Sequence, residues 1–335
     1  DLRPMRLSEW EVGIEMTLFD NVTFDLGYYQ RTSRDQILNQ QISNSSGFTS
    51  RRVNIGASRN NGVEWLLDLY PVRTERFSWN ASFNGSYNQS KVLNLGTDIG
   101  VDQITVGGAD FHGELRQVTG EPLNQLYGIG WLTDEQGRQV FNPTTGAPIP
   151  TEDEIPLGSA LPVWVGGIIN DFNYGKLSAW FLVDFKLGHK LISGTHMNAM
   201  RHGLDKSTLV GREEGCVVGD GVLPDGSVNT ICTPVQQFYE ATRTYRNSSG
   251  SVFNAGSWQL RQISIGYDVT DLLPARSGIS AMRVNLVANN VAVLKKWVPH
   301  LHPDQNGIYG DNRMGLEATG LPVTRGLGVN LNVTF

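Results

Sequence analysis

Long stretches in which apolar and polar residues alternate strictly constrain this chain more than any other feature. Between Phe77 and Asn88 the odd positions are apolar or small, and the even positions are Ser or Asn. The last residues, Val323–Phe335, repeat this design with Arg325 as the exception on the apolar side. Successive side chains of a β-strand point to opposite faces, so each run predicts a strand with one apolar and one polar face. Both runs are longer than the ~5–6 residues of an ordinary strand.

Further runs of this kind bring the expected total to about nine strands. The clear ones are Trp10–Leu18, Val22–Tyr28, Val63–Leu69 and Leu177–Leu187, and the less regular ones are Val163–Tyr174, Trp258–Val269 and Met282–Val291. Short and long connections alternate between them, and the longest cover about residues 92–161, 188–256 and 293–321. An outer-membrane barrel sorts its connections in this way, with short periplasmic turns and long extracellular loops.

The bulk composition agrees with an all-β membrane protein. Charged residues make up 18% of the chain, below the usual ~25%. No apolar stretch approaches the ~20 residues of a transmembrane helix, and basic residues do not cluster as nucleic-acid binding requires. We therefore predict a transmembrane antiparallel up-and-down β-barrel in lipid, with a soluble β-sandwich as the alternative fold.

The odd strand number predicts that the chain is part of a larger barrel. Bacterial single-chain barrels have even numbers of strands, and an unclosed sheet would leave unpaired backbone groups in lipid. We expect residues 1–335 to be the C-terminal part of one barrel domain, about the last nine strands of 22. The plug domain and the N-terminal strands would then lie outside this sequence.

Several segments, in order along the chain, resemble one family. Asn54–Glu64 is similar to an "N-x-G-x-x-x-N-x-G-[IV]-E" strand, Pro162–Tyr174 to a "P-x-x-x-G-G-x-x-N-x-F-x-Y" strand, Trp258–Tyr267 to "y-x-L-R-x-x-x-L-G-Y", and Leu321–Phe335 to the terminal strand. These are motifs of the SusC/RagA-like branch of TonB-dependent outer-membrane transporters. The usual "P-R" of the terminal motif is here spread as Pro-Val-Thr-Arg.

The resemblance implies import of oligosaccharides or oligopeptides across the bacterial outer membrane. It also implies a SusD-like surface lipoprotein as a lid, and the TonB complex as energy source, reached through N-terminal parts absent from this sequence. Two alternatives stay open: a SusC-like barrel that serves as a structural, partner-binding subunit of a larger complex, and a passive porin. Glycan and peptide substrates are not separated by the sequence, and the oligomeric state is open.

Cys216 and Cys232 are the only cysteines, and they lie in one predicted extracellular loop. Thiols there should be oxidised, so we expect a disulfide. Neither has a nearby Cys or His, which argues against a metal–thiolate site. Phe335, a terminal aromatic residue, resembles the signal that the barrel-assembly machinery reads in outer-membrane proteins.

Candidate ligand-binding residues come from the predicted lumen and the loops. Asn80, Asn84 and Asn88 should point into the lumen. The same face should carry the acidic residues Glu11, Glu15, Glu64 and Asp68. Tyr127, Trp131 and Tyr309 fall in predicted loops, where aromatic rings could stack on a sugar or a peptide.

No catalytic motif or cofactor-binding motif is present, so we expect neither an enzyme nor a cofactor. His300 and His302 are expected to form a strand-to-loop corner rather than a metal site. The segment Asp304–Asp311 offers oxygen ligands, but its spacing departs from the EF-hand pattern, and whether it holds calcium stays open.

Overall fold

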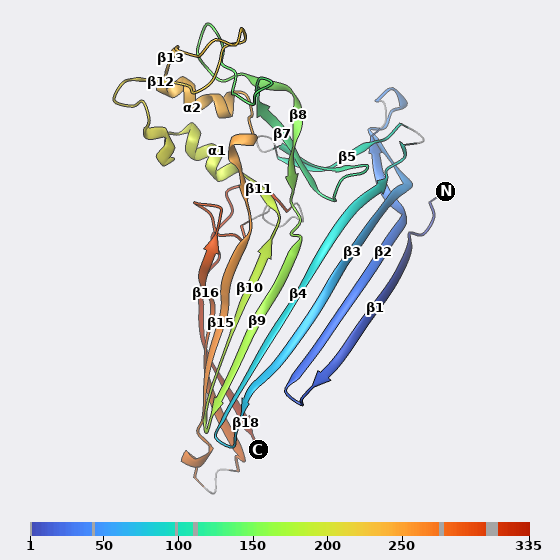
Figure 1. Ribbon diagram of the computed structural model, residues 1–335, viewed down its shortest axis with the longest axis vertical. Helices are drawn as coiled ribbons and strands as arrows, with labels where there is room; N and C mark the ends of the chain where they lie inside the picture. Colours follow the sequence, from blue (N-terminus) through green and yellow to red (C-terminus); the bar gives the residue numbers. More distant parts are fainter. Residues whose placement is uncertain (1, 42–43, 98–99, 110–112, 275–277, 306–313) are drawn as a thin grey trace.

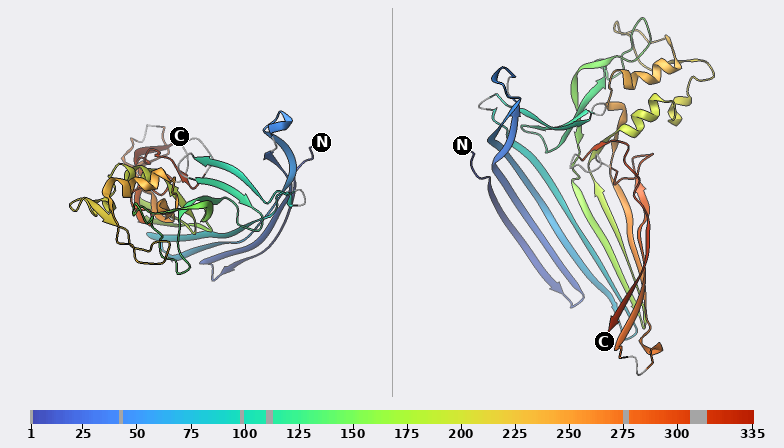
Figure 2. Two further views of the ribbon diagram at one scale, coloured as in Figure 1. Left: turned by 90° about the horizontal axis from the view of Figure 1, so that it is seen from above. Right: turned by 180° about the vertical axis from the view of Figure 1, so that it is seen from behind.

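One antiparallel sheet of nine strands forms the body of the computed structural model (Figure 1). The structure describes all residues except 1, 42–43, 98–99, 110–112, 275–277 and 306–313. In spatial order the strands are β1 (Arg6–Leu18), β2 (Val22–Gln41), β3 (Ser50–Arg73), β4 (Phe77–Asn94), β9 (Trp164–Tyr174), β10 (Leu177–Leu187), β15 (Ser257–Asp268), β16 (Ala281–Lys296) and β18 (Gly326–Thr334). The prediction of nine antiparallel strands is confirmed. Seen from above, they form an open arc (Figure 2).

The register of this sheet keeps apolar side chains on one face across all nine strands. Phe83 of β4, for example, lies opposite Leu67 of β3 and Ile168 of β9. The same face runs on to β18, where the Leu327 side chain is 89% exposed. Most polar residues of the strands lie on the other face, as the period-2 alternation predicts, although Leu66, Ile169 and Leu182 lie there too. A face of exposed apolar residues this large is suited to lipid rather than water.

Two of the strands are longer than the sequence pattern indicates. The alternation predicts strands over Val22–Tyr28 and Val63–Leu69, but β2 continues to Gln41 and β3 begins at Ser50. The sequence of these extensions is mostly polar, so it carries no alternation that could reveal a strand. A β-bulge shifts the register between Ser33 and Gln36, within the extension of β2.

At one end of the sheet the strands are joined by short turns. Asn21 donates a backbone hydrogen bond to Leu18 (3.2 Å) across the turn from β1 to β2. The two residues between them, Phe19 and Asp20, have φ values of 53° and 57°. Positive φ at both central positions defines the type I′ turn that suits a tight hairpin.

At the other end the long connections fold into a compact unit, which we call the cap. Its four-stranded sheet contains β5 (Gln103–Ala109), β6 (Gly113–Val118), β7 (Gln125–Trp131) and β8 (Pro150–Ser159). Its smaller sheets contain β11 (Lys190–Ser193), β14 (Val252–Asn254) and β17 (Leu316–Glu317), and β12 (Cys216–Val218) with β13 (Cys232–Pro234). Two helices complete it, α1 (Gly194–Arg201) and α2 (Val235–Thr244). Neither these nor any other helix in the described residues is long and apolar enough to span a membrane.

The cap has hydrophobic cores of its own. The main cluster joins Leu115 and Leu126 of the first long connection, Ile192 of the second and Leu316 of the third. A second cluster contains Leu191, Ala255, Val298 and Leu301. Connections of this length bury enough apolar surface to fold together, which explains why the predicted loops contain helices and strands.

Candidate functional site

The polar face of the sheet carries the three asparagines of β4. Asn88 accepts a hydrogen bond from the Tyr29 hydroxyl (2.9 Å), and these residues are opposite the same glycine, Gly62. Asn84 is exposed. The Oδ1 atom of Asn80 is buried and has no hydrogen-bond partner among the described residues. All three lie on the predicted polar face; their role in binding a ligand stays a prediction.

A groove of about 390 Å³ follows the polar face near Asn84. Three carboxylates line it, those of Glu11, Asp25 and Glu64. In the described part of the chain none of the three forms an ion pair, whereas Glu9 nearby faces Arg31 at 3.8 Å. Of the four acidic residues predicted on this face, Glu11 and Glu64 line the groove, and Asp25 joins them there; Glu15 and Asp68 are not among its lining residues. Since these carboxylates come from three adjacent strands, they form one negatively charged surface.

The two described loop aromatics lie in β7 of the cap. The Tyr127 ring is covered on one face by Arg116, whose Cζ atom lies 4.9 Å from the ring centroid. Arg116 is held there by ion pairs to Glu114 (3.0 Å) and Glu154. Trp131 packs edge-on against Tyr245, with 6.5 Å between ring centroids. Tyr309 lies outside the described residues.

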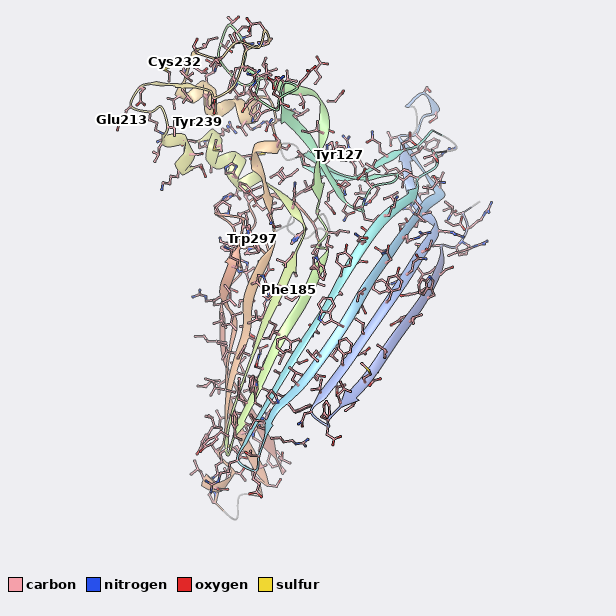
Figure 3. All side chains as sticks on the ribbon, viewed as in Figure 1. Tyr127, Phe185, Glu213, Cys232, Tyr239 and Trp297 are labelled. Atoms are coloured by element: carbon pink, nitrogen blue, oxygen red, sulfur yellow. A yellow bond between two sulfur atoms is a disulfide. The ribbon has the colours of Figure 1, made fainter. Side chains whose placement is uncertain are left out.

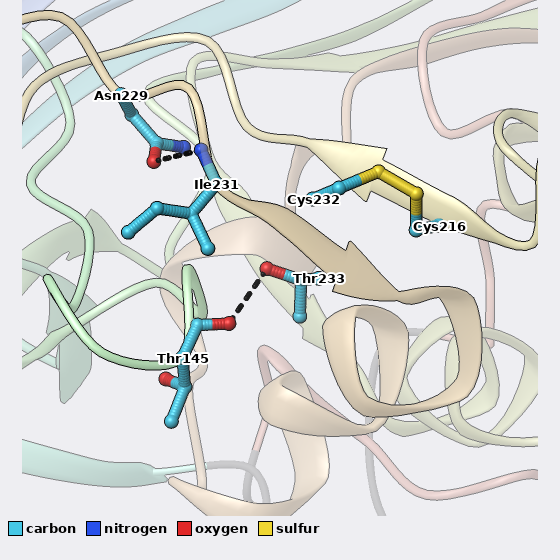
Figure 4. Close-up of a disulfide and its surroundings, with 6 residues drawn as sticks. All are labelled: Thr145, Cys216, Asn229, Ile231, Cys232 and Thr233. Carbon is cyan, nitrogen blue, oxygen red and sulfur yellow. Dashed lines mark hydrogen bonds between the residues drawn. A yellow bond between two sulfur atoms is a disulfide. The ribbon is translucent and has the colours of Figure 1, made fainter.

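The predicted disulfide is confirmed, because Cys216 and Cys232 are bonded across β12 and β13 (Figure 4). Its hairpin is fixed to the first long connection by the Thr233 hydroxyl, which donates to the Thr145 carbonyl (3.0 Å). Asn229 supports the same loop by accepting from the Ile231 amide (3.1 Å). The disulfide thus stabilises part of the cap rather than an independent loop.

A carboxylate is buried at the centre of the cap, and no sequence pattern predicts it. Glu317 is fully buried and accepts hydrogen bonds from the Ser193 hydroxyl (2.9 Å), the Thr195 amide (3.0 Å) and the Thr195 hydroxyl (2.8 Å). Thr195 lies in the first turn of α1, where free amides and the helix dipole stabilise an anion. These partners are more than 120 residues from Glu317 in sequence, so no local motif predicts the contact.

Two histidines, His196 and His300, lie beside this carboxylate. Their rings stack with 5.3 Å between centroids, and Ser193 also contacts the His300 Nε2 atom (3.1 Å). His196 contacts the Ser251 hydroxyl through Nδ1 (2.9 Å). Burial lowers the pKa of both imidazoles, and the His300 ring lowers that of His196 further. Both rings are therefore neutral at pH 7.

An ion-pair cluster attaches the third long connection to the sheet. Arg261, at a β-bulge of β15, donates through Nε to Asp184 of β10 (2.7 Å) and through Nη2 to Asp304 (2.9 Å). Burial opposes ionisation of Asp304, but the Arg261 hydrogen bonds outweigh it and lower the pKa of that carboxyl. Asp304 is thus engaged by protein groups. Among the described residues, no three His, Cys, Asp or Glu side chains gather as metal ligands, and residues 306–311 of the possible calcium loop lie outside them.

Phe335 follows β18 and its side chain is 88% exposed. It continues the alternation of Leu331 and Val333, which are on the apolar face. The residue is accessible to another protein or to lipid, and its role in barrel assembly stays a prediction.

A curved antiparallel sheet with an apolar outer face, a polar inner face and long connections at one end defines the wall of an outer-membrane β-barrel. Figure 3 shows this wall, where Phe185 is labelled, and the cap, where Tyr127 is labelled.

The comparisons with known proteins agree. The family model "TonB dependent receptor-like, beta-barrel" matches residues 1–205. TonB-dependent receptor P26 of Formosa agariphila is 24% identical over 97% of this chain and 34% of its own length. TonB-dependent receptor SusC of Bacteroides thetaiotaomicron is 25% identical over 42% of this chain and 15% of its own length. The solved structure of the RagAB peptide transporter covers 99% of this chain with a TM-score of 0.73 at 18% identity, over 35% of the matched chain.

The chain belongs to the TonB-dependent receptor family, whose members are outer-membrane β-barrel proteins. It spans about a third of the length of the curated relatives that match all along it. The fold expected from the resemblance is confirmed; the total of 22 strands and the division into domains stay predictions.

Proposed function

We propose that this chain forms part of the lumen wall and the extracellular cap of an importer for oligosaccharides or oligopeptides. The observation that carries the proposal is the division of the sheet into an apolar and a polar face over nine strands, with the long connections folded into a cap at one end. In outer-membrane barrels long connections face the outside. The cap would therefore meet substrate first.

Among the two substrate classes we favour oligopeptides. The acidic groove at Glu11, Asp25 and Glu64 attracts cations, and peptides carry an N-terminal ammonium group and basic side chains, whereas neutral glycans carry none. One solved structure of similar fold is described as a peptide transporter, which supports the same choice.

In the whole protein we propose that the TonB complex drives uptake and that a SusD-like lipoprotein closes the cap from outside. Similarity to SusC and to the RagAB transporter supports this proposal. We propose no catalytic activity, since the described side chains serve packing, ion pairing and the polar wall.

Uptake in cells tests this function. A strain that expresses the intact gene should accumulate labelled oligopeptides, and the same strain with TonB inactivated should lose this uptake. Purification under mild detergent should recover a surface lipoprotein with the barrel. Uptake that continues without TonB would favour a passive porin, and absence of any uptake together with recovery in a different complex would favour a structural subunit.

A further inference from the structure

A second cleft lies in the cap, outside the lumen and away from the groove described above. It has a volume of about 750 Å³ and opens between α1, α2 and the segment 203–215. Small-molecule sites in proteins have volumes of this order. Figure 3 labels Tyr239 and Glu213 in this part of the molecule.

Hydrogen bonds hold the cleft in shape without a ligand. Tyr239 of α2 is buried, and its hydroxyl lies 2.9 Å from the Ser207 carbonyl and 3.1 Å from the Val210 carbonyl. The disulfide hairpin borders the other side, because Gly215, which precedes Cys216, and Pro234, which pairs with Cys216 in the ladder, both line the cleft. A preformed site loses little conformational entropy when a ligand binds.

Arg212 is oriented toward the cleft by its own contacts. Its Nε atom donates to the Thr208 carbonyl (2.7 Å), and Nη2 donates to the Thr208 hydroxyl (2.6 Å) and to the Gly203 carbonyl. Nη1 has no hydrogen-bond partner among the described residues, so its two N–H groups stay available. A guanidinium fixed in this way is well suited to a carboxylate.

The other charges leave the cleft positive. Arg201, at the end of α1, is a second guanidinium in the lining and forms no ion pair in the described part of the chain. The single lining carboxylate, Glu240, accepts a hydrogen bond from Gln236 (2.9 Å). The lining therefore contains two arginines and one carboxylate, and that carboxylate is already hydrogen-bonded to Gln236.

Between these charges the lining is apolar. It includes the Met200 side chain, Val235 and the Tyr239 ring. We propose that the cleft binds a ligand in which a carboxylate is joined to an aliphatic group, with Arg201 and Arg212 on the carboxylate and the apolar lining on the aliphatic part. This site is independent of transport, since it requires neither the lumen nor an energy source.

Binding to the purified full-length protein in detergent tests the proposal by calorimetry. The probes are N-acetyl-leucine, its amide, which lacks the charge, and glucuronate, which lacks the aliphatic group. We expect N-acetyl-leucine to bind about tenfold more tightly than either of the others, because the amide loses the charged hydrogen bond and glucuronate loses the apolar burial. If the amide bound as tightly as N-acetyl-leucine, the proposed role of the arginines would be overturned. If glucuronate bound as tightly, the proposed role of the apolar lining would be overturned.

Variants locate the site. Arg201→Gln removes a cation that, among the residues the structure describes, forms no ion pair with another part of the cap, and it should weaken the binding of N-acetyl-leucine about tenfold. Arg212→Met should weaken binding as well, but it also removes the hydrogen bonds to Gly203 and Thr208 that shape the cleft. The Arg201→Gln variant is therefore the decisive test. Arg138→Gln is the matched control, an exposed arginine of the cap that pairs with Asp134 outside the cleft. Equal binding by the Arg201→Gln variant and the wild type would refute the assignment.

Discussion

Glycines beneath aromatic rings set how closely the strands of the wall pack. A Cβ atom added at Gly166 would lie 2.4 Å from the Asn84 carbonyl oxygen and 2.6 Å from the Phe185 ring. Gly85 is covered in the same way by the Trp65 ring. In both places the aromatic ring fills the space above the glycine. The ring therefore supplies the packing contacts that a glycine, which has no side chain, cannot make.

We predict that Gly166→Ala destabilises the wall by about 1–3 kcal/mol, because neither the backbone of β4 nor a packed ring can move away freely. Urea unfolding of the refolded protein in detergent measures the change. Gly328→Ala in β18 is the control, since a Cβ atom there meets nothing within 4 Å. Equal midpoints for the two variants would contradict the packing argument.

His189, at the junction of the wall and the cap, makes the stability of the protein depend on pH. Its side chain is 3% exposed and the Nδ1 atom has no partner among the described residues. Burial, helped by Lys186, lowers the pKa of His189 to about 4 from 6.5. Between these values the unfolded chain binds the proton and the folded chain does not, so stability falls as the pH drops from 6.5 toward 4.

At pH 5 the loss attributable to His189 should be on the order of 2 kcal/mol relative to pH 7.5. His189→Gln should therefore flatten the dependence of the melting temperature on pH. His202→Gln, at an exposed position, serves as control. An unchanged pH profile in the His189→Gln variant would show that other groups are responsible.

At the scale of elements, the strands were predictable and the cap was not. A wall strand can be predicted from its own residues, because lipid on one side and a polar interior on the other require apolar and polar residues to alternate. The segment Phe77–Asn88 is an example. The extensions of β2 and β3 could not be predicted in this way, because their sequence is mostly polar and does not alternate. Inside the cap, pairs such as Ser193 and Glu317 meet across 124 residues, and a single sequence contains no trace of such pairing.

The same comparison applies to the candidate site. The inward asparagines and acidic residues followed from strand parity, and the disulfide from cysteine number and location. The cleft lined by Arg201 and Arg212 could not be predicted, because it depends on the relative placement of two helices in a segment expected to be a loop.

Glu317 should be essential to the docking of α1. In the Glu317→Gln variant the amide nitrogen would face donors, and the anion at the helix N-terminus would be lost. We expect the cap to lose about 1–3 kcal/mol. Limited proteolysis within residues 194–213 would detect this opening, and Glu213→Gln, an exposed substitution nearby, should leave the cleavage rate unchanged. Equal cleavage rates in both variants would mean that α1 is held by other contacts.

At the scale of the whole molecule, the charge of the wall should select among substrates. Replacing the three carboxylates of the groove together (Glu11→Gln, Asp25→Asn and Glu64→Gln) removes negative charge with little change in volume. Uptake of lysine-containing oligopeptides should fall several-fold, and the difference should shrink as salt rises, because exposed charges are screened. Neutral oligopeptides are the internal control; an equal fall for both would indicate a steric rather than an electrostatic effect.

The main core of the cap also determines when the molecule can finish folding. Leu115, Ile192 and Leu316 pack together, so the cluster cannot close until nearly the whole chain has been delivered to the membrane. Strands joined by short turns, such as β1 with β2 and β9 with β10, can pair as hairpins from the start. The pairs β4 with β9 and β10 with β15, like the cap, must close a long connection, which costs more entropy and takes more time. The hairpins should therefore form first, and until the cap closes its connections would expose the apolar side chains of its core, so we expect these connections rather than the hairpins to be the weak point of biogenesis.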